Sequence, residues 1–239
     1  MKGYTAAGWI KLWRSAVQED MELTPHEFKF WTLLQAISVH TTSRKMDRGS
    51  VELSYSNIRV ILRGEDSRAK AYSYSTLSKS LTRLIETGRI ERLDPGKGNR
   101  VRVRIKQWDL LQHGNYDAVS GAKGGWLKVW RWAVLYEDMD LSPDEFKLWY
   151  LLLSLASHAD SEDARRTRGT VKTTFSNLRA TLTDASNTDK TLSRVLKKLE
   201  QTDRIEPLCD AKGGILRLHI CDWDLMQHRD YLAERWDAL

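Results

Sequence analysis

Basic residues recur in this chain at two spacings that would place them on one face of a regular element. Between positions 100 and 106 an Arg or Lys occupies every second position, so a strand would carry them all on one side. Between positions 190 and 198 the basic residues lie mostly three or four positions apart, as neighbours on a helix surface do. Guanidinium and ammonium groups gathered in this way bind phosphate and other anions. The chemistry that this pattern indicates is anion binding.

No pattern typical of catalysis or of a metal site accompanies these residues. The chain has no HExxH, no phosphate-binding GxxxxGK[ST] loop, no GxSxG and no CxxC. The six histidines are scattered. His40 and His158 occupy corresponding positions near helix ends, where interaction with the helix dipole is the ordinary role. We therefore expect a protein that is not an enzyme and that uses no cofactor and no metal.

The composition indicates a globular chain. Of its 239 residues, 41% are hydrophobic and 29% charged, and no apolar run approaches the roughly 18 residues that a membrane span needs. No basic-then-apolar signal sequence begins the chain. The two cysteines, Cys209 and Cys221, would lie near the turn and near the open end of one hairpin, too far apart for a disulfide. We expect a cytoplasmic protein without a membrane partner.

The chain is an internal duplication. QWDLLQH at 107–113 and DWDLMQH at 222–228 share five of seven residues, and the similarity continues along both halves. A period near 117 residues indicates a repeated domain rather than a solenoid unit. The other matching segments are GWIKLWRSAV (8–17) with GWLKVWRWAV (125–134), LTPHEFKFW (23–31) with LSPDEFKLW (141–149), RGSVELSYSNIR (48–59) with RGTVKTTFSNLR (168–179), and TLSKSLTRLIETGRIERL (76–93) with TLSRVLKKLEQTDRIEPL (191–208).

The duplication predicts two domains. Each copy has about the size of a typical domain, so we expect each to bury a core of its own and to fold alone. The stretch around position 118 is rich in Gly and small residues, as linkers are. The predicted division is domain 1 at 1–117, linker at 118–124 and domain 2 at 125–239. We refer to the two domains as copy 1 and copy 2.

The local signals in copy 1 alternate between helices and short strands. Thr24, Pro25 and Glu27 form a capping box before an apolar helical stripe, and the same pattern recurs at 142–145. Gly88 marks the end of a later helix. After an amino-terminal helix, the elements expected in copy 1 are a helix from Pro25 to about His40, a strand at 50–53, a short helix at 55–62, a helix from about Ser75 to Thr87, and two strands flanking a turn at 94–99.

This order predicts a winged helix, which is a helix-turn-helix followed by a β-hairpin, the wing. Copy 2 gives the same order, with its wing turn at 209–214. The predicted fold class is α+β and mainly helical, with two tandem winged helix-turn-helix domains.

A family resemblance rests on two motifs. WIKLWR (9–14) precedes the Pro-capped helix, and W-D-x-x-Q follows the last strand. With these motifs each copy resembles, almost end to end, the winged-helix domains of replication-initiation proteins, namely phage replisome organisers and the amino-terminal domain of the primosomal protein DnaD. The family typically has Asn-Trp-x-x-x-Gln after the wing. Trp108, Gln112, Trp223 and Gln227 match that segment, whereas Gln107 and Asp222 replace the Asn.

The resemblance implies DNA binding in replication initiation. The sequence departs from the family because it carries two amino-terminal-type modules and not the helical carboxy-terminal domain of DnaD. We therefore do not extend the family's helicase-loading role to this chain.

The repeated heptad is expected to close each domain. Trp108 and Trp223 would fold back after the wing and pack near the amino-terminal helix of their own copy, on Trp13 and Trp130. Base stacking by these rings is the alternative. Trp132 has no counterpart in copy 1 and indicates a contact between the copies, a partner surface or a core position.

The winged helix predicts where DNA would bind. The second helix of the helix-turn-helix enters the major groove, and its outward side contacts the bases. In copy 1 the stripe of Leu77, Leu81, Leu84 and Ile85 would be buried. The predicted DNA-binding residues of copy 1 are Ser75, Thr76, Lys79, Thr82 and Arg83 on the helix and Lys97, Asn99, Arg100, Arg102 and Arg104 on the wing. Those of copy 2 are Lys190, Thr191, Arg194, Lys197 and Lys198 on the helix and Lys212 and Arg217 on the wing.

The two copies differ in charge. Residues 1–120 hold 20 Lys and Arg against 13 Asp and Glu, whereas residues 121–239 hold 18 against 19. Arginines that alternate on one strand face repel each other unless an anion lies nearby. We therefore expect copy 1 to bind phosphate mainly through its wing and copy 2 mainly through its helix.

Together these features predict a sequence-specific double-stranded DNA-binding protein. The expected role is replication initiation for a phage, plasmid or mobile element. A transcriptional regulator with the same fold is the first alternative. A protein-interaction or oligomerisation scaffold of a replication or chromosome complex, favoured by the near-neutral copy 2, is the second. Replication proteins or a second molecule of the chain are further possible partners.

Overall fold

The computed structural model describes residues 7–40, 46–64, 72–93, 99–122, 124–158, 167–182, 188–208 and 214–228. These residues form an α+β protein that is mainly helical and contains small antiparallel sheets. None of the helices in these ranges is both long and apolar enough to span a bilayer.

The two copies contain the same elements in the same order. Copy 1 comprises β1 (Trp9–Trp13), α1 (Arg14–Glu19), η1 (Asp20–Glu22), α2 (Pro25–Ile37), β2 (Ser50–Ser54), α3 (Tyr55–Arg63), α4 (Tyr74–Glu86), β3 (Ile90–Arg92), β4 (Arg100–Ile105) and α5 (Trp108–Gln112), followed by α6 (Tyr116–Ser120). Copy 2 comprises β5 (Trp126–Trp130), α7 (Arg131–Tyr136), η2 (Asp138–Asp140), α8 (Pro143–Leu155), β6 (Thr170–Thr174), α9 (Phe175–Leu182), α10 (Asp189–Gln201), β7 (Ile205–Pro207), β8 (Ile215–Ile220) and α11 (Trp223–His228).

Side-chain caps begin the helices where the sequence predicts them. Thr24 caps α2 through the backbone N–H of Glu27, whose carboxylate accepts a hydrogen bond from the N–H of Thr24 in return. Ser142 and Glu145 form the same capping box on α8. Gly88 follows α4 with a φ of 73°, a left-handed conformation that favours glycine.

A three-stranded antiparallel sheet completes each copy. The last strand is central, so the orders are β2-β4-β3 and β6-β8-β7. Val101, Val103 and Ile105 of β4 are buried, while the intervening arginines lie on the other face of the sheet.

The amino-terminal segment of each copy forms a strand before it forms a helix, so the prediction of a helix there is wrong for residues 9–13. Ile10 and Leu12 point into the core, and Lys11 points out. These residues form a strand because of a tertiary contact: β1 pairs antiparallel with β5 of the other copy. In this register Lys11 faces Lys128, and Trp9 faces Trp130. The pairing is symmetric about the two lysines, so an approximate twofold axis relates the copies.

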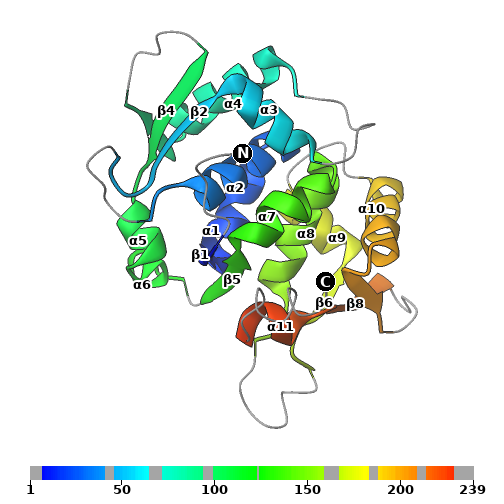
Figure 1. Cartoon of the computed structure of the whole chain (residues 1–239). Coiled ribbons are helices and arrows are strands. Elements are labelled where there is room, and N and C mark those ends of the chain that lie inside the picture. Colours follow the sequence, from blue (N-terminus) through cyan, green and yellow to red (C-terminus); the bar gives the residue numbers. More distant parts are fainter. Residues whose placement is uncertain are drawn as a thin grey trace.

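The long helices α2 and α8 pack against each other in the middle of the molecule, with the sheets of the two copies on opposite sides (Figure 1). Phe28 of α2 contacts Phe146 and Tyr150 of α8 edge-on, with ring centroids 6.1 Å apart in both pairs. The buried apolar residues of both copies form one continuous cluster. Each copy therefore completes the core of the other.

Four buried basic side chains tie the copies together through backbone carbonyls. Lys29 donates to the carbonyl oxygens of Met139 and Leu141, at 2.8 and 2.6 Å. Arg14 donates to those of Ser154 and Ala156, at 2.7 and 2.6 Å. Burial lowers the pKa of Lys29 to about 8. The symmetry-related contacts join Lys147 to Met21 and Leu23 and join Arg131 to Ala36 and Ser38.

The repeated heptad closes its own copy against the amino-terminal strand. The Gln112 side chain accepts from the N–H of Lys11 and donates to its carbonyl, at 2.9 and 3.1 Å, and so continues the edge of β1. The indole N–H of Trp13 donates to the carbonyl of Leu111 at 2.7 Å. Gln227 and Trp130 make the equivalent bonds in copy 2. The closing role of the heptad is confirmed.

The heptad tryptophans pack elsewhere than predicted. Trp108 is buried, covers Gly49 and meets His40 edge-on, with ring centroids 5.0 Å apart. Trp223 takes the same position over Gly169. His40 lies beyond the end of α2 and serves as a ring contact rather than as the predicted helix cap. Burial, together with the nearby charge of Arg131, lowers the pKa of His40 to about 4.

The predicted linker at 118–124 begins within α6 (Tyr116–Ser120), which packs back on copy 1. The Asp117 carboxylate accepts from the hydroxyl of Ser15 at 2.7 Å and from the N–H of Gly125 at 2.6 Å. Cys221 is a half-buried free thiol, and Cys209 lies outside the described residues.

Candidate nucleic-acid interface

The helix α4 presents the outward face that the sequence predicts for copy 1. Leu77, Leu81 and Leu84 are buried and Ile85 packs on the core, which fixes the rotation of the helix. Ser73 caps its first turn through the N–H of Thr76 at 3.0 Å. The opposite side then points to solvent, with Ser75, Lys79, Thr82 and Arg83 exposed and Thr76 partly buried.

The helix α10 presents a more strongly basic face in copy 2. Leu192, Val195, Leu196 and Leu199 are buried against the core. Lys190, Arg194, Lys197 and Lys198 are exposed, and Thr191 is partly buried. The ion pairs found among the described residues do not involve these four cations, whereas the neighbouring Asp189 pairs with Arg179 at 3.3 Å. The face is thus free to neutralise an external anion.

An arginine repeated in both copies holds the start of each outward helix. In copy 1 the Nε of Arg59 on α3 donates to the carbonyl of Tyr72 at 2.6 Å. Its guanidinium also lies over the ring of Tyr74, 4.6 Å from the centroid. In copy 2 the equivalent Arg179 on α9 pairs with Asp189 at the first turn of α10. Arg59 and Arg179 occupy corresponding positions in the repeat, which is the signal in the sequence for their shared place.

The arginines of the first wing are neutralised within the sheet. Arg100 pairs with Glu52 at 3.1 Å, and Arg104 pairs with Glu91 at 2.5 Å. Arg102 lies directly opposite Glu52 in the β2–β4 register. The mutual repulsion from which we predicted a phosphate site on this wing is therefore offset by carboxylates of the protein itself. Arg100, whose side chain is 74% exposed, still reaches solvent, as does Asn99.

In the second sheet, two basic residues face each other at the positions where the first sheet has an acidic and a basic residue. Lys172 of β6 lies directly opposite the predicted residue Arg217 of β8, and both are exposed. Glu52 and Arg102 occupy these positions in copy 1. Like charges in direct cross-strand contact are destabilising, so this pair favours a bound anion. Sequence reasoning missed Lys172, although its alignment with Glu52 was a visible signal.

Two predicted wing residues, Lys97 and Lys212, lie outside the described residues. The remaining predicted residues do not form one site. They divide into the outward face of α4, the outward face of α10 and the exposed sides of the two sheets. Figure 1 places α4 and α10 on different sides of the central pair α2 and α8.

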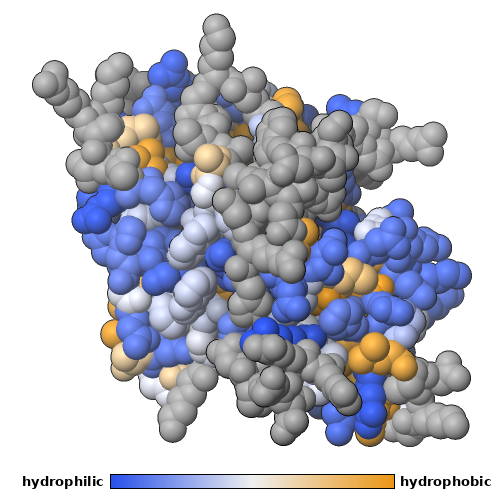
Figure 2. Space-filling model, turned by 60° about the horizontal axis from the view of Figure 1, so that its bottom comes forward, coloured by the Kyte–Doolittle hydropathy of each residue, from blue (hydrophilic) through white to orange (hydrophobic). Residues whose placement is uncertain are grey.

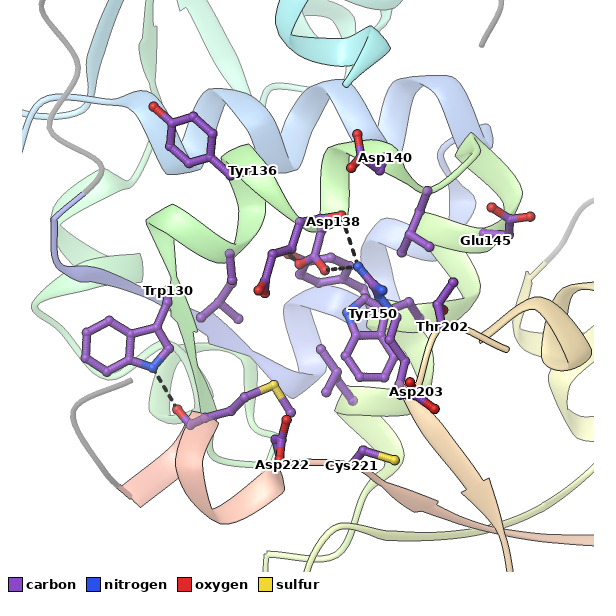
Figure 3. A pocket seen from close by; sticks show the side chains of 18 of the residues that line it. Trp130, Tyr136, Asp138, Asp140, Glu145, Tyr150, Thr202, Asp203, Cys221 and Asp222 are labelled. Carbon is purple, nitrogen blue, oxygen red and sulfur yellow. Dashed lines mark hydrogen bonds and ion pairs between the residues drawn. The ribbon is translucent and has the colours of Figure 1, made fainter. Parts of the chain in front are cut away.

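Each copy also contains a cleft on the side of its heptad. In copy 2 the cleft has a volume of about 650 Å³ and is lined by β5, α7, η2, α8 and the end of α10 (Figure 3). At its base Asp138 accepts from Arg204 at 3.3 Å and from the hydroxyl of Tyr150 at 2.9 Å. Burial raises the pKa of Asp138 to about 6, although Arg204 opposes that shift.

The acidic groups in this cleft do not form a metal site. Figure 3 shows Asp140, Glu145, Asp203 and Asp222 spread around the cavity rather than converging. Within the part of the chain that the structure describes, no group of three or more His, Cys, Asp or Glu side chains is placed to hold a metal ion. On the face in Figure 2, the described residues are mostly hydrophilic, and the hydrophobic ones form small separate groups.

The candidate interface therefore rests on the geometry and the charge of its residues alone. Comparison of the chain with protein-family models, with curated proteins and with solved structures finds no match.

Proposed function

We propose that the protein binds double-stranded DNA through two winged-helix domains joined as a twofold-related pair. In each copy the order is helix, strand, helix, helix, strand, strand, with the last strand in the centre of an antiparallel sheet. This order and pairing support the proposed assignment to the winged-helix fold, in which α4 and α10 would be the helices that enter the major groove.

One observation carries the proposal. The outward face of α10 holds Lys190, Arg194, Lys197 and Lys198, all exposed, on a helix whose other face is fixed by buried leucines. Phosphate contacts need exposed cations on a rigid element, and base contacts need a helix that can approach the groove. A face that served solubility alone would not need four cations on one side of a rigidly packed helix.

The proposed role in replication initiation rests on the family resemblance of the two copies. A transcriptional regulator would use the same helices, and the sequence at the bound sites would separate the two. A selection of bound sequences from random duplexes, followed by mapping of the sites, provides that test.

DNA binding itself is tested by fluorescence anisotropy with a labelled duplex. We expect binding that weakens steeply with salt, because each phosphate contact contributes about −0.9 to the slope of log K against log salt concentration. Arg194→Ala should cost about 1–3 kcal/mol on the preferred site and relax the preference at one or two base pairs. Lys198→Ala should weaken all sequences about equally.

Arg48→Ala is the matched control. It also removes one partly exposed arginine, but Arg48 lies in copy 1 and pairs with Asp109 of the heptad in that same copy. This variant should bind like the wild type. No detectable binding of the intact protein to any duplex at low salt would contradict the proposal.

A further inference from the structure

The outer face of the copy 2 sheet carries two cations side by side. Lys172 of β6 lies directly opposite Arg217 of β8, so the two side chains share one face of the ladder, and both are exposed. Among the described residues neither cation has an ion-pair partner. The pair therefore repels itself, and the positive charge of both groups is open to solvent.

The third strand of this sheet does not offer the pair a carboxylate. The N–H of Leu208 donates to the carbonyl of Arg217 at 2.9 Å, so an apolar and half-exposed residue lies beside Arg217. Glu206, the acidic residue of β7, faces His219 instead. Like charges directly opposite each other destabilise a sheet. An anion from outside the chain would remove that repulsion.

The same place in copy 1 already holds an oxyanion, which belongs to the protein. Glu52 of β2 occupies the position of Lys172, and Arg102 of β4 occupies that of Arg217. One carboxylate oxygen of Glu52 lies 3.1 Å from a guanidinium nitrogen of Arg100, and the other lies 3.9 Å from Arg102. Guanidinium groups bind carboxylate and phosphate oxygens in the same way. This face of the ladder can therefore hold an oxyanion between its strands.

We propose that Lys172 and Arg217 form a phosphate site on the outer face of β6 and β8, and that its occupant is a phosphate of the DNA backbone. In copy 2 a lysine replaces the internal carboxylate, so the oxyanion has to come from outside. The helix α10 packs on β7 of this sheet, and Figure 1 shows α10 and β8 on the same side of the molecule. The DNA occupant rests on the proposed function, whereas the phosphate site itself does not.

The first test exchanges two residues between the copies. Glu52→Lys with Lys172→Glu keeps the composition and the net charge of the full chain but moves the cation pair to copy 1. Inorganic phosphate, titrated against chloride at constant ionic strength, should shift the amide resonances of residues 172 and 217 in the wild type. In the exchange variant these shifts should be lost and should appear at residues 52 and 102. Shifts that are absent from the wild type, or that ignore the exchange, would overturn the phosphate site.

A melting experiment checks the same site without DNA. Lys172→Glu alone recreates the acid–base pair of copy 1 and should raise the melting temperature in chloride by about 1–4 °C, because a repulsive cross-strand pair becomes attractive. Inorganic phosphate should then stabilise the wild type more than this variant, since only the wild type gains a bound anion. Equal stabilisation of the two proteins by phosphate would count against the site.

The last test identifies DNA as the source of the phosphate. Arg217→Gln should reduce the slope of log K against log salt concentration by about 0.9 and weaken all duplexes about equally, because one phosphate contact is lost. Arg48→Gln removes the same charge from an arginine paired with Asp109 and should leave the slope unchanged.

The outcomes separate this proposal from the proposed function. If the wild type binds duplex and Arg217→Gln keeps its slope, the occupant is not DNA, although the proposed function stands. If the wild type binds no duplex while phosphate still shifts residues 172 and 217, both the proposed function and the DNA occupant are wrong, and the phosphate site alone is supported.

Discussion

The ammonium nitrogen of Lys147 lies 2.8 Å from the carbonyl oxygen of Met21 in the other copy. The Lys147 side chain is only 1% exposed, and it also donates to the carbonyl of Leu23 at 2.7 Å. The equivalent Lys29 returns the same contacts to copy 2. The carbonyl oxygens of Met21 and Leu23, and those of Met139 and Leu141, therefore accept hydrogen bonds from the opposite copy. The centre of the interface thus contains polar contacts as well as apolar ones.

Lys147→Met should weaken the whole protein. The change keeps the aliphatic volume but leaves buried carbonyls without their donor, so we expect a loss of about 2 kcal/mol or more in the free energy of unfolding. Lys190→Met, on the exposed face of α10, should change it by less than about 0.5 kcal/mol. Urea unfolding followed by tryptophan fluorescence measures both, and equal effects would show that the interface does not depend on this lysine.

The halves should not behave as the sequence predicts when they are separated. The repeat indicates two domains that fold alone, yet their cores are continuous and β1 would lose its partner strand. We expect residues 1–122 to form a homodimer, because Lys29, Arg14 and the carbonyls that they need all occur within copy 1. Sedimentation equilibrium tests this, and a folded monomer of that half would restore the original expectation.

Gly49→Ala should cost more than Gly88→Ala. Both glycines have a left-handed φ, of 75° and 73°, so both changes carry the conformational cost of about 1–2 kcal/mol. A Cβ on Gly49 would lie 2.7 Å from Cβ and Cγ of Trp108, whereas one on Gly88 would meet nothing within 4 Å. We expect the difference in free energy of unfolding to be a further 1–3 kcal/mol, as in other overpacked cores. Similar losses would mean that Trp108 can move aside.

Stability should depend on Asp138 between pH 4 and 6. Burial raises the native pKa of this carboxyl to about 6, above the roughly 3.9 of an unfolded chain. In this range the native state binds more protons than the unfolded state, so the free energy of unfolding falls as pH rises. Relative to Asp138→Asn, the wild type should lose up to about 3 kcal/mol across the window. Parallel pH profiles for the two proteins would contradict this pKa.

The helix of copy 1 should contribute more to DNA binding than its wing. Lys79 and Arg83 have no partner among the ion pairs of the described residues, whereas Arg100 and Arg104 are paired with Glu52 and Glu91. Lys79→Ala with Arg83→Ala should therefore reduce affinity more than the triple change Arg100→Ala, Arg102→Ala and Arg104→Ala. Anisotropy titrations give the order, and the reverse order would place the first wing at the phosphates.

Local signals in the sequence predict much of each copy. The capping boxes at Thr24 and Ser142, the glycine after α4 and the alternation in β4 depend only on neighbouring residues, and the structure contains all of them. The buried stripe of α4 follows from its helical period for the same reason.

The sequence could not predict contacts between distant segments. The local pattern predicts a helix at residues 9–13, whereas their strand conformation depends on a partner strand about 117 positions away. Lys29 sits in an apolar helix, and nothing local shows that carbonyls of the other copy receive it. The pairing of Arg104 with Glu91 depends on which strands are neighbours in the sheet. In each case the missing information was the packing of elements, not their type.

The symmetric pairing of β1 with β5 has a consequence for how α4 and α10, the two helices proposed to bind DNA, can evolve. In a dimer of identical chains every mutation appears twice, and the partners separate on dilution. Here the link between the copies makes their association intramolecular, so it persists at any concentration. A change in α10 is not mirrored in α4, and the pair Lys172 and Arg217 can replace Glu52 and Arg102 on one side alone. A target recognised by both helices therefore need not be a perfect palindrome.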